Sequence, residues 1–290
     1  MTRRNVASIR PAPRHDVGSL FSHLPISDPT DRQLDPFLIL GHHGPQVFEA
    51  GNHGMPFDDH PHRGFETVTF ILDGSLVHSD SSGHHRAIEK GGVQWMTAGS
   101  GVIHNEQVPP AFRKEGGSLE ILQLWVNLPS NLKWVPPRYT GVQRDTLPAV
   151  PLPSGAATLN LVAGQFGETI GPIDSLTGIF MSNIELRTGA HVELPVPRGR
   201  TILFYIVRGN VVIEGHAASQ RDLVIFGDDG DTISFEAGSD ALVLFAHGDP
   251  IGEPVAARGP FVMNTDEEIE QAFRDYRTGA FKSAETAEIE

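Results

Sequence analysis

The sequence lacks cysteine, long apolar runs and an excess of positive charge. With no cysteine among 290 residues, disulfide bonds and thiolate metal sites are excluded. No apolar run reaches the roughly 18 residues that a transmembrane helix needs. Lysine and arginine number 22 against 36 acidic residues, giving a net charge of −14; this argues against nucleic acid as a direct ligand, because phosphate backbones bind to basic surfaces. No apolar segment follows the arginines of residues 1–15 as it would in a signal peptide, so we expect a cytoplasmic protein without membrane contact.

Glycine and proline, by contrast, are abundant and spread along the chain, with 31 and 22 residues. This composition is typical of many short strands joined by turns. Alternating or β-branched segments at 66–72, 119–127, 201–207 and 241–246 predict strands. We therefore expect an all-β protein with one domain at 1–128, a second at 159–290, and a connector at 129–158. The connector is marked by Pro129, Pro136, Pro137, Pro148, Pro151 and Pro153.

Two short motifs carry candidate metal ligands: His60-Pro61-His62 and His104-Asn105-Glu106. Side chains in a strand point to the same face at every second residue. His60 and His62 therefore share one face of a strand, and His104 and Glu106 share one face of another. If both faces look into the same barrel, three imidazoles and one carboxylate converge and leave two positions of an octahedral metal open. This set favours Fe(II), Mn(II) or Ni(II), whereas closed structural zinc sites more often contain cysteine.

A less specific interpretation stays open, because the chain contains 14 histidines and a His-x-His pair arises often by chance. The pair His42-His43 is an example, since adjacent strand residues cannot share a face. We expect this pair in a polar loop that follows a strand at 37–40. Trp95 and Trp125 are expected in the core rather than beside a substrate.

The spacing Gly-x5-His-x-His-x3-Glu-x7-Gly, from Gly54 to Gly74, resembles the first motif of the cupin superfamily. The wider segments 60–69 and 93–106 are similar to the pirin family, and so are residues 35–38 and 259–264. The resemblance thus touches nearly the whole chain. It implies a bicupin fold, that is, two antiparallel β-barrels of the jelly-roll type.

The resemblance also implies a ligand set. In pirins two histidines of the first motif and the histidine and glutamate of the second hold the metal. Many cupins use the glutamate at the position of Glu66 instead, so Glu66 is expected here, with Gln94, to support the ligands through hydrogen bonds. One divalent metal per chain is expected, Fe(II) first, with Ni, Mn, Co, Cu or Zn as alternatives. The pirin ligands correspond to His60, His62, His104 and Glu106.

The second half repeats the glycine spacing of the first without its metal-binding residues. Gly189 to Gly209 spans the same length as Gly54 to Gly74. Aligned on these glycines and on the segment after Gly227, the four ligand positions fall on residues that cannot bind a metal, so we expect a metal in the N-terminal barrel alone. These residues are Pro195, Pro197, Ile233 and Phe235. Near the end, a capping-box signature at residues 265–268 predicts a short helix near 266–277.

Two main classes of function follow from the resemblance. Bacterial pirins are associated with quercetin 2,3-dioxygenase chemistry, in which a flavonol ring is cleaved by dioxygen and carbon monoxide is released. Glu106 would then both hold the metal and take the proton of the flavonol 3-hydroxyl. Alternatively, pirins act as metal-dependent regulators that bind proteins such as transcription regulators or metabolic enzymes, and the metal would sense redox state without turnover. A purely structural metal is a third reading. We expect the enzyme, with a flavonol-like substrate and dioxygen as its partners and a protein partner as the alternative.

Overall fold

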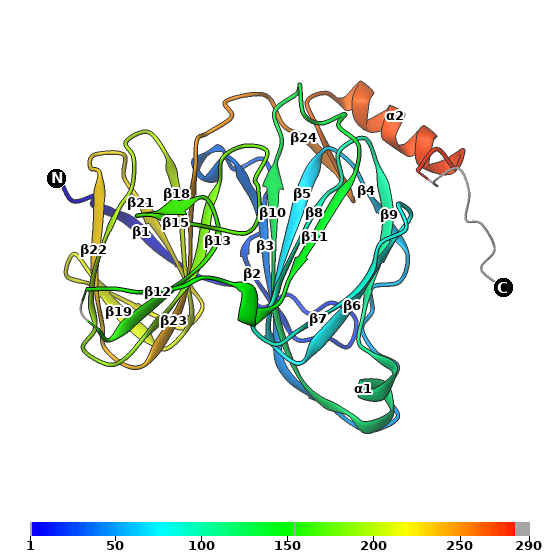
Figure 1. Ribbon diagram of the computed structural model, residues 1–290. Coiled ribbons are helices and arrows are strands. Elements are labelled where there is room, and N and C mark those ends of the chain that lie inside the picture. The colour runs from blue at the N-terminus through cyan, green and yellow to red at the C-terminus, as the bar shows by residue number, and fades with distance from the viewer. Residues whose placement is uncertain (1, 154, 282–290) are drawn as a thin grey trace.

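The computed structural model describes residues 2–153 and 155–281 of the chain. Within this range the protein consists almost entirely of antiparallel strands, arranged as two barrel-like units side by side (Figure 1). Each unit packs a large sheet against a four-stranded sheet. The predicted all-β bicupin with a short C-terminal helix is confirmed.

The first barrel holds both histidine motifs. Its six-stranded sheet has the order β11 (Arg138–Val142), β8 (Val93–Thr97), β5 (Phe65–Asp73), β10 (Gly117–Asn127), β3 (Phe37–Phe48) and β2 (Ser22–Ile26). The facing sheet has the order β4 (His60–His62), β9 (Val102–Gln107), β6 (Ser75–Asp80) and β7 (His85–Glu89). Helix α1 (Pro110–Glu115) joins β9 to β10. The two motifs therefore lie in one small sheet, on neighbouring strands β4 and β9.

The second barrel repeats this plan with an apolar interior. Its large sheet has the order β1 (Val6–Pro11), β21 (Asp222–Phe226), β18 (Thr201–Arg208), β23 (Ala241–Gly248), β16 (Phe180–Leu186), β13 (Ala157–Ala163) and β12 (Ala149–Pro151). The small sheet has the order β17 (His191–Pro195), β22 (Thr232–Ala237), β19 (Asn210–Ile213) and β20 (His216–Ser219). Short elements complete the chain: η1 (Arg32–Leu34), η2 (Arg144–Thr146), β14 (Gln165–Phe166), β15 (Thr169–Ile170), β24 (Ala256–Arg258) and β25 (Phe261–Met263).

The strand register corrects the comparison of the two halves by one residue. His60 pairs with His104 in the first barrel, and Leu194 pairs with Ile233 in the second. Leu194 and Val196, rather than Pro195 and Pro197, therefore occupy the positions of His60 and His62. Both are buried, whereas the two prolines are exposed. The glycine alignment failed because the segment from glycine to strand is one residue shorter in the second half; the residues that replace the ligands are still apolar.

The two large sheets pack face to face and form a shared core. Val68 and Leu124 from the first barrel meet Leu203 and Leu244 from the second in one buried cluster. Strands β5 and β18 are buried on both faces, because one face lines its own barrel and the other contacts the opposite sheet. This double burial explains why both segments read as nearly continuous apolar runs.

The adjacent histidines lie in this sheet and not in a loop as expected. His42 and His43 are both buried within β3. His42 faces the second barrel, where its Nδ1 lies 2.8 Å from the Tyr205 hydroxyl and its Nε2 lies 2.9 Å from Glu120 Oε1. His43 faces the opposite way, with Nδ1 2.6 Å from Ser22 Oγ. The polar residues of this apolar strand thus have specific buried partners, which local sequence could not reveal.

Each end of the chain packs on the barrel that is formed mainly by the other half of the sequence. Strand β1 pairs with β21 of the second barrel, although residues 1–128 were assigned to the first domain. Helix α2 (Asp266–Arg277) and β25 return to the first barrel and cover its β4–β9 side (Figure 1). The connector is also divided, since β11 pairs with β8 and β12 pairs with β13. We therefore assign residues 6–11 to the second barrel and residues 256–277 to the first.

Two buried cations fasten the C-terminal segment to the first barrel. The Lys133 ammonium donates to the carbonyl oxygens of Gly64 and Val262, at 2.8 and 3.1 Å, and to Asn127 Oδ1 at 2.7 Å. Arg63 binds Asp275 of α2 through a 2.7 Å ion pair. Helix α2 begins at the predicted position, with a capping box between Thr265 and Glu268. The segment that follows the second barrel is thus built into the wall of the first.

Candidate metal centre

Three histidines from the two motifs converge inside the first barrel. His60 and His104 are directly opposed on β4 and β9, and His62 follows His60 on the same face. The ring centroids lie 4.8 Å apart for His60 and His62, 4.3 Å for His60 and His104, and 4.9 Å for His62 and His104. One ring nitrogen from each lies within 4.8 Å of the others. Pro61 is tolerated between them because β4 is an edge strand.

The hydrogen bonds of these rings leave nitrogens free for a metal. His60 Nδ1 lies 2.7 Å from the Asp58 carbonyl oxygen, and His62 Nδ1 lies 3.2 Å from the Pro260 carbonyl oxygen. A carbonyl can only accept, so each Nδ1 carries a hydrogen, and in the neutral form of the ring Nε2 keeps its lone pair. Neither nitrogen of His104 has a hydrogen-bond partner among residues 2–153 and 155–281, although both are buried. Such orphaned buried nitrogens fit a divalent metal as their missing partner.

Burial keeps His62 and His104 neutral, which is the form that binds a metal. Burial, with the neighbouring His60, lowers the pKa of His62 to about 3. Burial and the two other rings lower the pKa of His104 well below its usual range. Both imidazoles are therefore unprotonated at neutral pH and need not lose a proton before they bind a cation.

Glu106 lies on the same face of β9 as His104, but its carboxylate is held from the facing sheet. Oε1 accepts hydrogen bonds from Thr69 Oγ1, at 3.1 Å, and from the Gln94 amide. Oε2 accepts from the Gln123 amide at 2.5 Å. The group of side chains whose ligand atoms lie within 4.8 Å of one another contains the three histidines and not Glu106. Three of the four expected ligands therefore lie close together, and the fourth, Glu106, follows His104 on the same face of β9.

The two residues expected to support the ligands lie in different places. Gln94 reaches Glu106, as described above. Glu66 lies on the face of β5 that contacts the second barrel, together with Val68, and accepts a hydrogen bond of 2.6 Å from Thr97 Oγ1. The expectation that it supports the histidines is not met, because Gly64, at φ +88°, breaks the strand between His62 and Phe65 and resets the alternation. Burial raises the pKa of Glu66 to about 7.

Several residues around the site were missed by sequence reasoning. Trp125, expected in the core, stacks on Phe65 with centroids 4.3 Å apart and lies edge-on to His62 at 5.2 Å. Trp95 does belong to the core between the barrels. Gln123, on the same face of β10 as Trp125, is also only partly buried, so solvent reaches the barrel interior beside the histidines. Their signal in the sequence is weak, because β10 reads as an ordinary core strand until its register with β5 is known.

His78 and Tyr139 are two further side chains packed beside the site. His78 is directly opposite Glu106 across β6 and β9, and its Nε2 lies 2.9 Å from Asp80 Oδ2. The ring of Tyr139 stacks on it with centroids 4.1 Å apart. Burial and the nearby charge of Glu106 raise the pKa of the Tyr139 phenol, so Tyr139 keeps its proton and acts as a donor. Neither residue belongs to a recognisable sequence motif.

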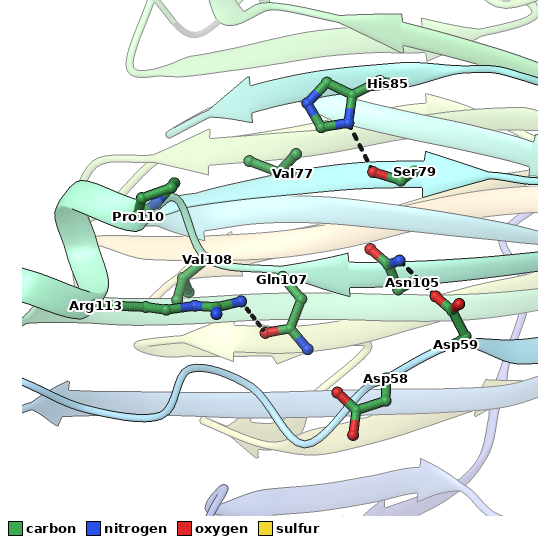
Figure 2. Close-up of a pocket in the computed structure, with 10 residues that line it drawn as sticks. All are labelled: Asp58, Asp59, Val77, Ser79, His85, Asn105, Gln107, Val108, Pro110 and Arg113. Atoms are coloured by element: carbon green, nitrogen blue, oxygen red, sulfur yellow. Dashed lines mark hydrogen bonds between the residues drawn. The ribbon is translucent and has the colours of Figure 1, made fainter. Parts of the chain in front are cut away.

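A cavity of about 700 Å³ lies on the opposite side of the same sheet (Figure 2). Asn105 and Gln107 line it and alternate along β9 with His104 and Glu106, so the cavity is outside the barrel wall. Asn105 donates to Asp59 Oδ1 at 2.6 Å, and Arg113 donates to Gln107 Oε1 at 3.0 Å (Figure 2). This cavity and the metal centre are therefore separate features. No helix in the described residues is long and apolar enough to cross a membrane.

Comparisons with known proteins agree with this geometry. The family model described as "Pirin" matches residues 20–126, and the one described as "Pirin C-terminal cupin domain" matches residues 181–282. A Pseudomonas aeruginosa protein named "Putative quercetin 2,3-dioxygenase" is 38% identical over 276 residues, which cover 93% of this chain and 95% of that protein.

Two solved structures extend the comparison. The crystal structure of a quercetin 2,3-dioxygenase from Acinetobacter baumannii superposes with a TM-score of 0.92 at 33% identity and covers 98% of this chain and 100% of its own. A bacterial pirin from Escherichia coli, solved in complex with nickel(II), has a TM-score of 0.66 at 26% identity and covers 84% of this chain and 99% of its own. Both halves of the sequence, the bicupin fold and the histidine cluster lead to one conclusion: the chain belongs to the pirin family.

Proposed function

We propose that this pirin is a cytoplasmic, metal-dependent dioxygenase that cleaves flavonols in the manner of quercetin 2,3-dioxygenase. The observation that carries the proposal is the group of three histidines whose ring nitrogens meet inside a barrel open to solvent. The names of its relatives support the choice of reaction. The second barrel contributes no comparable group within the described residues, since Leu194, Val196, Ile233 and Phe235 fill the equivalent positions.

His60, His62, His104 and Glu106 would hold the metal in this proposal, with Fe(II) as the first choice. Three imidazoles and a carboxylate suit Fe(II), Ni(II) or Mn(II) better than a closed zinc site. When bound, such an ion supplies Lewis-acid and redox chemistry and positions open to substrate and dioxygen. The carbonyls of Asp58 and Pro260 fix the ring orientation of His60 and His62, as outer hydrogen bonds commonly do for ligating histidines.

Glu106 has a second role in the proposal, as the base that takes the proton of the flavonol 3-hydroxyl. All its hydrogen bonds in the structure are accepted from donors on Thr69, Gln94 and Gln123, which describes an ionised carboxylate. A carboxylate beside open metal positions can accept a proton from a hydroxyl that arrives there. Trp125 and Phe65 give the same space an aromatic wall against which a flat ring can pack.

The proposal is tested with protein prepared without a nickel column and loaded with one metal at a time. We expect one equivalent of metal per chain, and dioxygen consumption and carbon monoxide release on addition of quercetin. His62→Ala should lose metal and turnover together, while His191→Ala, on the surface of the second barrel, should change neither. Two equivalents of metal in the parent would contradict the single centre. A metal-loaded parent that turns over no flavonol would contradict the enzyme and leave the protein-binding regulator.

A further inference from the structure

Glu106 is held so that little of its hydrogen-bonding capacity remains free. A carboxylate offers about four acceptor sites, two on each oxygen. Thr69 and Gln94 occupy both sites of Oε1, and Gln123 occupies one site of Oε2. One acceptor site, on Oε2, remains for a further partner such as a metal ion.

The two glutamines that hold Glu106 are themselves held by aromatic donors. The Trp125 indole N–H donates to Gln123 Oε1 at 3.3 Å. Since an indole nitrogen can only donate, the amide oxygen of Gln123 must face Trp125, and its NH₂ group must face Glu106. On the other side, the Tyr139 hydroxyl donates to Gln94 Oε1 at 3.1 Å and turns the NH₂ group of Gln94 in the same direction. Each aromatic residue thus holds its glutamine with the NH₂ group towards the carboxylate: Trp125 because its N–H can only donate, and Tyr139 because its hydroxyl donates to Gln94 Oε1.

The aromatic side chains are well placed to fix these directions. Trp125 packs against Phe65 and His62, and Tyr139 is stacked on His78. If either N–H or O–H were missing, the glutamine behind it could turn its oxygen towards Glu106. Two oxygens with negative partial or full charge would then face each other in a buried site, and Glu106 would move or tilt.

We propose that Trp125 and Tyr139 are positioning residues for Glu106: acting through Gln123 and Gln94, they leave a single acceptor site on Oε2 free and so set how firmly the centre retains its metal. This inference rests on the proposed role of Glu106 as a ligand. It assigns a function to two aromatic residues that are not among the proposed metal ligands.

The test compares the rate at which metal-loaded protein loses its ion to an excess of chelator. Tyr139→Phe removes one oxygen and keeps the ring on His78; we expect loss about 10-fold faster, the lower end of what removing outer hydrogen bonds to metal ligands typically causes. Trp125→Phe should also make metal loss faster, in this case through Gln123. Tyr205→Phe is the matched control, because its buried hydroxyl contacts His42 between the barrels, and it should lower stability without changing metal retention.

A double-mutant cycle separates positioning from general loosening. If Tyr139 acts through Gln94, Tyr139→Phe should have little further effect in a Gln94→Met background. The visible absorption of the Co(II)-loaded protein should also shift in Tyr139→Phe and not in Tyr205→Phe, because it reports the ligands of the ion. Equal rates and spectra for the parent, Tyr139→Phe and Trp125→Phe would overturn the inference and leave the metal centre intact. A parent that binds no metal at all would remove the proposed function and this inference together.

Discussion

At the scale of single residues, Glu106 is the most informative position. Glu106→Gln removes the charge and keeps the size, so three histidines should still hold a metal when the ion is saturating. We expect dioxygen consumption with quercetin to fall by about 10²–10⁴-fold, the usual contribution of a general base. Metal content and oxygen uptake measured on the same samples give the comparison.

His60→Ala serves as the contrasting variant, because it should lose metal and turnover together. If Glu106→Gln keeps both metal and parental turnover, Glu106 is not the base. A full loss of metal in Glu106→Gln at saturating ion would instead make it an indispensable ligand. In Glu106→Gln, the new NH₂ group faces a donor amide of Gln94 or Gln123.

Residue-level prediction from the sequence succeeded where a local rule was enough. The two-residue alternation correctly placed His60 with His62 on one face, and His104 with Glu106 on another, because each motif lies within one unbroken strand. The same rule failed for Glu66, because Gly64 interrupts the strand. A Cβ at Gly64 would lie 2.0 Å from the Val262 carbonyl oxygen, and that contact comes from a segment almost 200 residues further along the chain. No local pattern contains such information.

At the scale of elements, the C-terminal segment is the part with the clearest role outside its own domain. A chain that ends after residue 264 loses α2 and the Arg63–Asp275 ion pair but keeps Pro260 and Val262. A chain that ends after residue 254 also loses the carbonyl that orients His62 and one that binds Lys133. We expect both to be less stable than the full chain, and we expect only the shorter one to lose most of its metal.

Circular dichroism and metal analysis of both truncated chains test this expectation. Helix α2 itself could be predicted, because its capping box and its apolar positions are local features. The barrel on which the helix packs could not be predicted, because the helix follows the second barrel in sequence and packs on the first. Equal metal retention by both truncated chains would show that the Pro260 carbonyl is dispensable for the orientation of His62.

At the scale of the whole molecule, buried neutral histidines should make the metal-free protein sensitive to mild acid. Burial lowers the pKa of His42, His62 and His247 to about 3 and that of His43 to about 4. It also lowers the pKa of His104 well below its usual range. Below pH about 6.5 the unfolded chain takes up protons that the folded chain refuses. The free energy of unfolding should therefore fall as the pH decreases from about 6.5 towards 4.

One group opposes this trend. Because the pKa of Glu66 is raised to about 7, the folded chain binds a proton there before the unfolded chain does, and this contribution grows as the pH falls from about 7 to 4.5. The loss of unfolding free energy caused by the five histidines should exceed the gain from Glu66. Urea unfolding between pH 7.5 and 4.5 gives the slope, and His247→Phe, which preserves the stacking on Phe180, should reduce it. A free energy of unfolding that rises steadily as the pH is lowered from 7.5 to 4.5 would contradict the assignment of neutral histidines.

The exchange of chain ends also bears on how the protein is made. His62 Nδ1 contacts the carbonyl oxygen of Pro260, which lies 198 positions further along the chain. At a synthesis rate of about 5–20 residues per second, the ribosome adds the intervening polypeptide in roughly 10–40 s. We therefore expect His62 of the nascent first barrel to lack this partner until Pro260 has been synthesised. We expect firm capture of a metal ion only after Pro260 has been added to the chain, and not on completion of the first half.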